Sequence, residues 1–220
     1  MHSWRYWIIV LTTFPNVLNM IKIEKKKYTC ISIVIMLIVF LANLLASTEY
    51  NVPAIFLSGG GKLVDYLGVK KDAVFDNCQF YRLLTYGFTQ SSVLHLSANI
   101  AALLFVGGYF ENYVGRIKLV IIFAVGLILP GCFLTLLYPD GLHYGASPAI
   151  FACIGVLVNW ALRKKDLWKL YRKQIGVWYV VGYFFLSNIL GIVTLIFHLM
   201  GFLTGILLGF LIRHTVTERE

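Results

Sequence analysis

Residues 194–212 read TLIFHLMGFLTGILLGFLI, a stretch without Asp, Glu, Lys or Arg. A spanning helix needs about 20 apolar residues, because the hydrocarbon core is roughly 30 Å thick and a helix rises about 1.5 Å per residue. The stretch has this length, and it carries one ionisable side chain, His198, in its interior. It therefore predicts a transmembrane helix with an imidazole inside the bilayer.

The composition of the whole chain is also that of a membrane protein. Of the 220 residues, 59% are hydrophobic and 13% are charged, whereas about 25% of a soluble domain is charged. A soluble domain of this size could not hide so much apolar surface, because small domains leave a large share of the chain exposed. The composition excludes a soluble enzyme, a disordered chain, a disulfide scaffold and a conventional nucleic-acid binder.

Six apolar segments predict an all-α polytopic membrane protein with six transmembrane helices. Their expected bounds are 29–47, 93–110, 117–137, 146–162, 175–192 and 194–212. We expect residues 29–212 to form one membrane domain, in which a loop at about 48–92 is the longest connection. Residues 1–28 are expected to lie in the cytoplasmic interface, and residues 213–220 to form a cytoplasmic tail.

Lysines and arginines sort to one side of these segments. They gather before the first segment, between the second and third, between the fourth and fifth, and after the sixth. Basic residues mark the cytoplasmic side, so both termini are expected inside and the long loop outside. The net charge of +9 then reflects topology and attraction to membrane lipids, and no nucleic-acid partner is expected.

Polar side chains inside a span are costly, so each one calls for a functional hypothesis. His95 and Asn99 lie four residues apart, which places them on one face of the second helix. They either form hydrogen bonds that hold neighbouring helices together or line a site.

The fourth segment begins at Gly145-Ala146-Ser147-Pro148. Proline favours the first helical position, which would make Ser147 the N-cap, surrounded by unpaired backbone N–H groups. Such groups stabilise an oxyanion, although a plain capping serine is the commoner reason for this pattern. The G-x-S motif is weak by itself, because Ala149 stands where a hydrolase elbow has its second glycine.

His198 lies on one helical face with three glycines that would let another helix approach closely. These are Gly201, Gly205 and Gly209. An imidazole in a tight interface needs a polar partner, and Ser147 would complete a pair of nucleophile and general base. No carboxylate lies in the second, fourth, fifth or sixth segment, so we expect two members and no aspartate.

Two other ionisable residues, His143 and Glu111, need a separate interpretation. His143, four residues before Ser147, is an alternative base, but we expect it to be a solvated loop histidine. Glu111, at the far end of the second helix, is expected to be structural.

In their order along the chain, these motifs resemble those of the rhomboid family of intramembrane serine proteases, over about residues 29–212. The matching motifs are QFYRLLT at 79–85, His95-x-x-x-Asn99, GGYFENYVG at 107–115, Gly145-Ala146-Ser147, and His198-x-x-Gly201-x-x-x-Gly205. One departure bears on activity. The family usually has glycine directly after the serine, and Pro148 here removes an N–H that would help to bind an oxyanion.

The resemblance implies a serine endopeptidase that cuts the transmembrane segments of other membrane proteins, with no cofactor and no metal. It also implies that the fifth helix is a lateral gate. The implied site residues are the nucleophile Ser147, the general base His198, the oxyanion-site residues Asn99 and His95, the substrate-facing Gly145, and Phe151, which packs on the histidine ring.

Two alternatives stay open beside a protease. An inactive rhomboid-like protein would bind membrane clients, and Pro148 is the argument for it. A transporter or channel would use the intramembrane histidine and asparagine residues to line a path, but the chain shows neither internal repeats nor intramembrane carboxylates. A metal site built from the histidines lacks a cysteine or carboxylate. The expected location is multi-pass in a bacterial plasma membrane, and the oligomeric state is left open.

Overall fold

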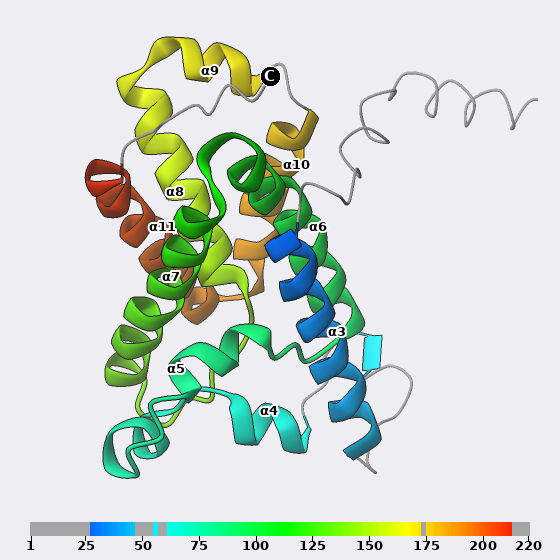
Figure 1. Ribbon diagram of the computed structural model, residues 1–220. Coiled ribbons are helices and arrows are strands. Elements are labelled where there is room, and N and C mark those ends of the chain that lie inside the picture. The colour runs from blue at the N-terminus through cyan, green and yellow to red at the C-terminus, as the bar shows by residue number, and fades with distance from the viewer. Residues whose placement is uncertain (1–26, 47–54, 57–60, 173–174, 213–220) are drawn as a thin grey trace, which may run out of the picture.

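The computed structural model describes residues 27–46, 55–56, 61–172 and 175–212, and its regular elements are helical (Figure 1). Nearly all of the expected N-terminal segment 1–28, and the tail 213–220, lie outside the described residues. The elements are α3 (Lys27–Ala46), α4 (Lys62–Leu67), η3 (Asp72–Asp76), α5 (Arg82–Thr85), η4 (Tyr86–Phe88), α6 (Val93–Tyr109), η5 (Phe110–Val114), α7 (Arg116–Leu137), α8 (Ser147–Arg163), α9 (Lys165–Arg172), α10 (Ile175–Ser187), η6 (Asn188–Leu190) and α11 (Ile192–Leu211).

Six helices, α3, α6, α7, α8, α10 and α11, occupy the six segments that the hydropathy pattern predicts. Their bounds agree within two residues, except that α10 already ends at Ser187. Within the described residues, three helices (α3, α7 and α11) are long and apolar enough to cross a bilayer. A fourth is added if the bent pair Arg82–Phe88 and Val93–Tyr109 counts as one span.

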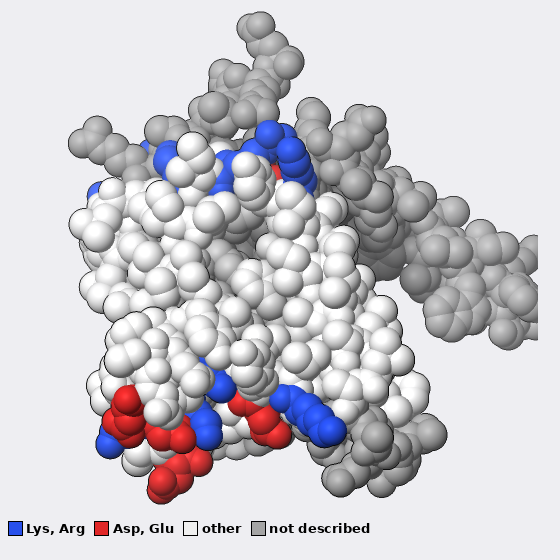
Figure 2. Space-filling view, turned by 60° about the horizontal axis from the view of Figure 1, so that its bottom comes forward, with Lys and Arg blue, Asp and Glu red and all other residues white. Residues whose placement is uncertain are grey.

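On the face drawn in Figure 2, an uncharged zone of the described residues lies between two charged ends. Large apolar side chains of the long helices are exposed; Ile38, Leu41 and Leu207 are each more than half exposed. Contiguous apolar surface of this kind is stable against hydrocarbon and not against water. The chain is a multi-pass, all-helical integral membrane protein.

The entry to α6 is a sharp bend. Helices Arg82–Phe88 and Val93–Tyr109 meet at 98°, and the four residues between them, 89–92, are polar and buried. Ser92 is the N-cap of α6, and its Oγ accepts the backbone N–H of His95 at 3.2 Å. His95 therefore lies in the first turn of α6, directly after the bend.

Glycines bring α8 and α11 into direct backbone contact. A Cβ added at Gly201 would collide with the carbonyl oxygen of Pro148, and one added at Gly205 would collide with that of Ala152. On the other side, a Cβ at Gly155 would collide with the carbonyl oxygen of Phe202. The expectation that the glycine face of the last helix admits a close neighbour is confirmed. Because Gly201 touches Pro148, Ser147 and His198 lie at the same level of the bundle.

A buried carboxylate joins the start of α3 to the end of α6. Glu111, in η5, accepts the backbone N–H groups of Tyr28 at 3.1 Å and Thr29 at 2.5 Å. Arg116 Nε lies 3.7 Å from the same carboxylate. The first N–H groups of a helix lack intrahelical partners, so Glu111 caps α3 from a distance and is structural, as expected.

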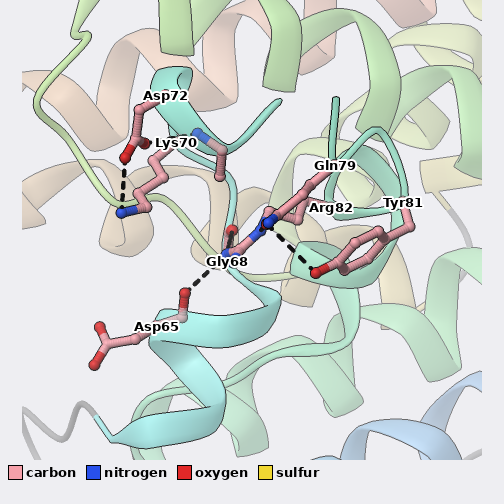
Figure 3. A network of polar contacts seen from close by, with 8 residues as sticks. Asp65, Gly68, Lys70, Asp72, Gln79, Tyr81 and Arg82 are labelled. Atoms are coloured by element: carbon pink, nitrogen blue, oxygen red, sulfur yellow. Dashed lines mark hydrogen bonds and ion pairs between the residues drawn. The ribbon is translucent and has the colours of Figure 1, made fainter. Parts of the chain in front are cut away.

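The connection that carries α4 and α5 is held by one guanidinium (Figure 3). Arg82 is 5% exposed, and it donates to the carbonyl oxygens of Asp65 and Gly68, both at 2.8 Å, and to Gln79 Oε1 at 2.6 Å. Arg82 thus satisfies two backbone carbonyls at the end of α4.

A short bridge ties this connection to the segment before α8. Val69 and His143 exchange backbone hydrogen bonds of 2.9 Å in each direction. The Gly145 N–H also donates to the Tyr86 carbonyl at 2.9 Å. These bonds fix the chain immediately before Ser147.

Candidate active site

Ser147 and His198 form a hydrogen-bonded pair between α8 and α11. The distance from Ser147 Oγ to His198 Nε2 is 2.8 Å, and the two residues are 5% and 3% exposed. Ser147 is the first residue of α8, and Ala146 is the N-cap, without a capping side chain. The expected N-cap position of Ser147 is therefore off by one residue, and its hydroxyl bonds the imidazole instead of the helix start.

Two further groups surround the imidazole. The Phe151 ring stacks on it, with centroids 4.3 Å apart and planes inclined by 11°. Asn188 Oδ1 lies 2.9 Å from His198 Nδ1. The ring is thus held by Ser147 at one nitrogen, by Asn188 at the other and by Phe151 on a face.

Asn99 lies buried on α6 at 1% exposure and is oriented by two neighbours. Its Nδ2 donates to Gln90 Oε1 at 2.8 Å, and the Tyr183 hydroxyl donates to its Oδ1 at 2.9 Å. An amide nitrogen carries two hydrogens. Among the described residues, the second hydrogen on Asn99 Nδ2 has no acceptor, so it is available to a ligand.

Gly145 and His95 lie against each other beside Ser147. Gly145 has φ +115°, a conformation that favours glycine. A Cβ there would lie 2.8 Å from His95 Nε2 and 3.9 Å from Ser147 Oγ. A side chain at this position would fill the space between the imidazole of His95 and the hydroxyl of Ser147.

His143 differs from its expected state. It is 9% exposed, with its ring 5.9 Å from that of Phe197, so the expectation of a solvated loop histidine is wrong. Burial lowers the pKa of His143 below its usual value, and the backbone of Tyr138 opposes part of this shift. The Ser147 hydroxyl bonds His198 and not His143.

Three residues at the site escaped the sequence analysis in these roles: Gln90, Tyr183 and Asn188. Gln90 is fully buried, yet it stands in a polar stretch that reads as a surface loop. Tyr183 is one of many aromatic residues in its helix, and nothing in the sequence pairs it with Asn99. Asn188 is an uncharged residue near the end of the fifth apolar segment, and nothing in the sequence pairs it with His198.

The chemistry available here is nucleophilic. A serine hydroxyl bonded to an imidazole at the start of a helix brings together a nucleophile, a base and helix N–H groups, which are groups that acyl transfer uses. Among the described residues, no group of three His, Cys, Asp or Glu side chains could hold a metal ion.

Comparison with known proteins finds rhomboid proteins throughout. Residues 77–215, more than half of the chain, match the Rhomboid domain family. The chain is 30% identical over 147 residues to Rhomboid-like protease 3 of Toxoplasma gondii, covering 64% of this chain and 55% of the relative. It is 30% identical over 123 residues to Inactive RHOMBOID-like protein 8 of Arabidopsis thaliana, covering 56% and 34%.

A third relative, RHOMBOID-like protein 7 of Arabidopsis thaliana, is 25% identical over 222 residues, covering 96% of this chain and 67% of the relative. The chain spans about a third of the inactive relative and about half of the protease. These relatives come from eukaryotes, and they give no support to the expected bacterial plasma membrane. Their names include a protease and an inactive protein.

Proposed function

The chain belongs to the Rhomboid domain family, and from this premise we propose that it is an intramembrane serine endopeptidase. The observation that carries the proposal is the buried 2.8 Å hydrogen bond between Ser147 Oγ and His198 Nε2. A chain that only binds clients has no need of a serine hydroxyl held against an imidazole.

The proposed reaction is hydrolysis of a peptide bond through an acyl-enzyme. Ser147 Oγ attacks the scissile carbonyl carbon while its proton passes to His198 Nε2. The C–N bond then breaks, and His198 returns the proton to the leaving amine. His198 then takes a proton from a water molecule while the water oxygen attacks the acyl carbon. The bond between that carbon and Ser147 Oγ breaks, Ser147 Oγ recovers the proton from His198, and the new carboxyl end leaves.

The oxyanion of the tetrahedral intermediate needs donors. We assign this role to the free hydrogen of Asn99 Nδ2 and to the backbone N–H at the start of α8, beside His95. Pro148 offers no N–H, so more of the stabilisation falls on Asn99 than in relatives with glycine there. Gly145 leaves space for the substrate backbone.

The proposed substrates are transmembrane segments of other proteins. An apolar cavity of about 300 Å³ lies among α6, α8, α9, α10 and α11. Phe184 lines this cavity and its ring lies 5.4 Å from that of Phe151, which stacks on His198. An apolar segment that enters between α6 and α10 would therefore reach the site from the hydrocarbon.

We further propose that all six long helices cross the bilayer, with both termini in the cytoplasm. Basic residues flank the starts of α3, α7 and α9, and the positive-inside rule then assigns these ends to the cytoplasm. Ser147, at the opposite end, would cut near the outer face.

An inactive client-binding protein is the second candidate function. Pro148 favours it, because the nitrogen that follows the nucleophile cannot donate, and so does the similarity to a relative named as inactive. The two functions differ in whether Ser147 is an activated nucleophile.

The test is labelling of the purified, detergent-solubilised chain with a fluorescent fluorophosphonate, beside Ser147→Ala and His198→Ala. Serine attack on phosphorus expels fluoride, and the bound fluorophore is read on a gel. We expect the wild type to label and both variants to lose nearly all of the signal, while each variant still unfolds cooperatively. A folded wild type that stays unlabelled in detergent and in lipid bilayers would overturn the protease and leave the client-binding candidate.

A further inference from the structure

We propose that Asn188 is a positioning residue that fixes the tautomer of His198, so that the reacting pair works as a serine–histidine–asparagine triad. This inference rests on the proposed function, because it assigns a role within the same reaction. Asn188 opens η6 at the end of α10, ten residues before the histidine. Its Oδ1 lies 2.9 Å from His198 Nδ1.

The orientation of the Asn188 amide is determined by its other contact. Asn188 Nδ2 donates to the Phe184 carbonyl oxygen at 2.6 Å. A carbonyl oxygen only accepts hydrogen bonds, so the atom that faces Phe184 must be the amide nitrogen. The amide oxygen must then face His198.

This orientation dictates the protonation pattern of the imidazole. An amide oxygen beside Nδ1 requires that Nδ1 carry the hydrogen, because two acceptors facing each other would repel. A neutral imidazole has one N–H, so Nε2 is left as the acceptor that faces Ser147 Oγ at 2.8 Å. In the other tautomer, His198 could not take the Ser147 proton. Asn188 therefore selects the reactive form of the base.

An amide also suits the surroundings better than a carboxylate. The His198 ring is buried and stacked on Phe151, and an ionised carboxylate in such apolar surroundings carries a large desolvation cost. Asn188 supplies the same acceptor to Nδ1 without a charge. This accounts for a third member in a region with no aspartate or glutamate.

The competing explanation is that Asn188 only caps α10 by bonding the Phe184 carbonyl. Ser187 provides a matched control, because its Oγ donates to the same carbonyl at 3.4 Å, whereas the His198 ring nitrogens bond Asn188 and Ser147. Replacing Asn188 by aspartate separates the two roles. Aspartate keeps an oxygen for Nδ1, whereas alanine removes it.

The experiment compares wild type, Asn188→Ala, Asn188→Asp and Ser187→Ala by the concentration dependence of fluorophosphonate labelling. Thermal unfolding of each variant checks its fold. We expect Asn188→Ala to lower the maximal labelling rate at least about 10-fold, short of the roughly 10⁴-fold loss that a wrong tautomer causes in a serine–histidine–aspartate triad. The probe concentration at half-maximal rate should stay unchanged. Asn188→Asp should label faster than Asn188→Ala, because its carboxylate still offers an oxygen to Nδ1, and slower than the wild type, because that carboxylate carries a desolvation cost. Ser187→Ala should match the wild type.

The inference fails if the wild type labels and Asn188→Ala labels equally fast. It also fails if the alanine and aspartate variants lose the same rate, because Asn188 would then act only through the end of α10. An unlabelled wild type would instead refute the proposed function on which the inference rests.

Discussion

Helices α11 and α10 both pack around the site, but they are held in different ways. The α11 backbone lies directly against that of α8, with glycines at the contact. By contrast, α10 meets its neighbours through large side chains: the Tyr179 ring lies 4.9 Å from Phe105, and the Phe184 ring 5.4 Å from Phe151. Much of α10 is also open to its surroundings, with Trp178 and Phe185 about two-thirds exposed.

The two kinds of helix contact coincide with two proposed roles, reaction and orientation. Ser147 and His198, which are proposed to react, stand on the pair with backbone contact. Asn188 and Tyr183, which orient His198 and Asn99, stand at the end of the helix held by side chains. A shift of α10 would leave the distance between Ser147 and His198 unchanged while it withdrew both orienting groups. Entry of a substrate beside α10 would then change the orientation of His198 and Asn99, while the hydrogen bond between Ser147 and His198 could remain.

The largest expected effect comes from breaking the backbone contact. Gly201→Val would place a branched side chain against the Pro148 carbonyl, and overpacking of this kind costs about 3 kcal/mol. We expect a lower unfolding temperature and no fluorophosphonate labelling. The control is Gly182→Ala on α10, where nothing lies within 4 Å of an added Cβ. Equal tolerance of the two substitutions would contradict the contrast between the helices.

A smaller effect is expected from removing one orienting group on α10. Tyr183→Phe deletes the hydroxyl that donates to Asn99 Oδ1, a loss of about 1 kcal/mol, which corresponds to roughly fivefold in labelling rate. Tyr179→Phe is the matched control on the same helix, since the hydrogen bond that its hydroxyl makes within the described residues is long, at 3.5 Å to the Ala98 carbonyl. A rate loss in the control as large as in Tyr183→Phe would show that general packing of α10 is responsible.

The smallest expected effect is on the pH dependence of the unfolding temperature. Burial lowers the pKa of His143 from its usual value of 6.5, so the unfolded chain binds a proton that the folded chain resists. Stability is therefore lost as the pH falls through about 6.5. Between pH about 7.5 and 5.5, the unfolding temperature of His143→Gln should fall by about 2 °C less than that of the wild type. An identical fall would mean that His143 titrates normally in the fold.

Much of the helical architecture could be predicted from the sequence. A helix in a bilayer must satisfy its own backbone and present apolar side chains, so hydropathy alone locates the six long helices within a few residues. Ser147 and His198 stand out because polar residues in such segments are rare and their spacing to glycines is regular. Hydropathy predicted the number of spans less well. Six spans were expected, and within the described residues three or four helices are long and apolar enough to cross a bilayer.

The groups that orient the site could not be predicted, because tertiary contacts decide them. Asn188 faces His198 only because α10 ends at Ser187. Gln90 reaches Asn99 because the chain bends by 98° at the polar stretch before α6. His143 is buried because its backbone pairs with Val69, in a distant connection. None of these contacts has a periodic pattern in the sequence.

The cap that Glu111 provides for α3 constrains how the chain is assembled in the membrane. Tyr28 and Thr29 donate their N–H groups to a carboxylate that lies 83 and 82 residues further along the chain. During synthesis, α3 enters the bilayer long before Glu111 is made, so the start of the helix must first be satisfied by water or lipid headgroups. The Glu111 cap on α3 therefore forms only after α6 and η5 have been synthesised.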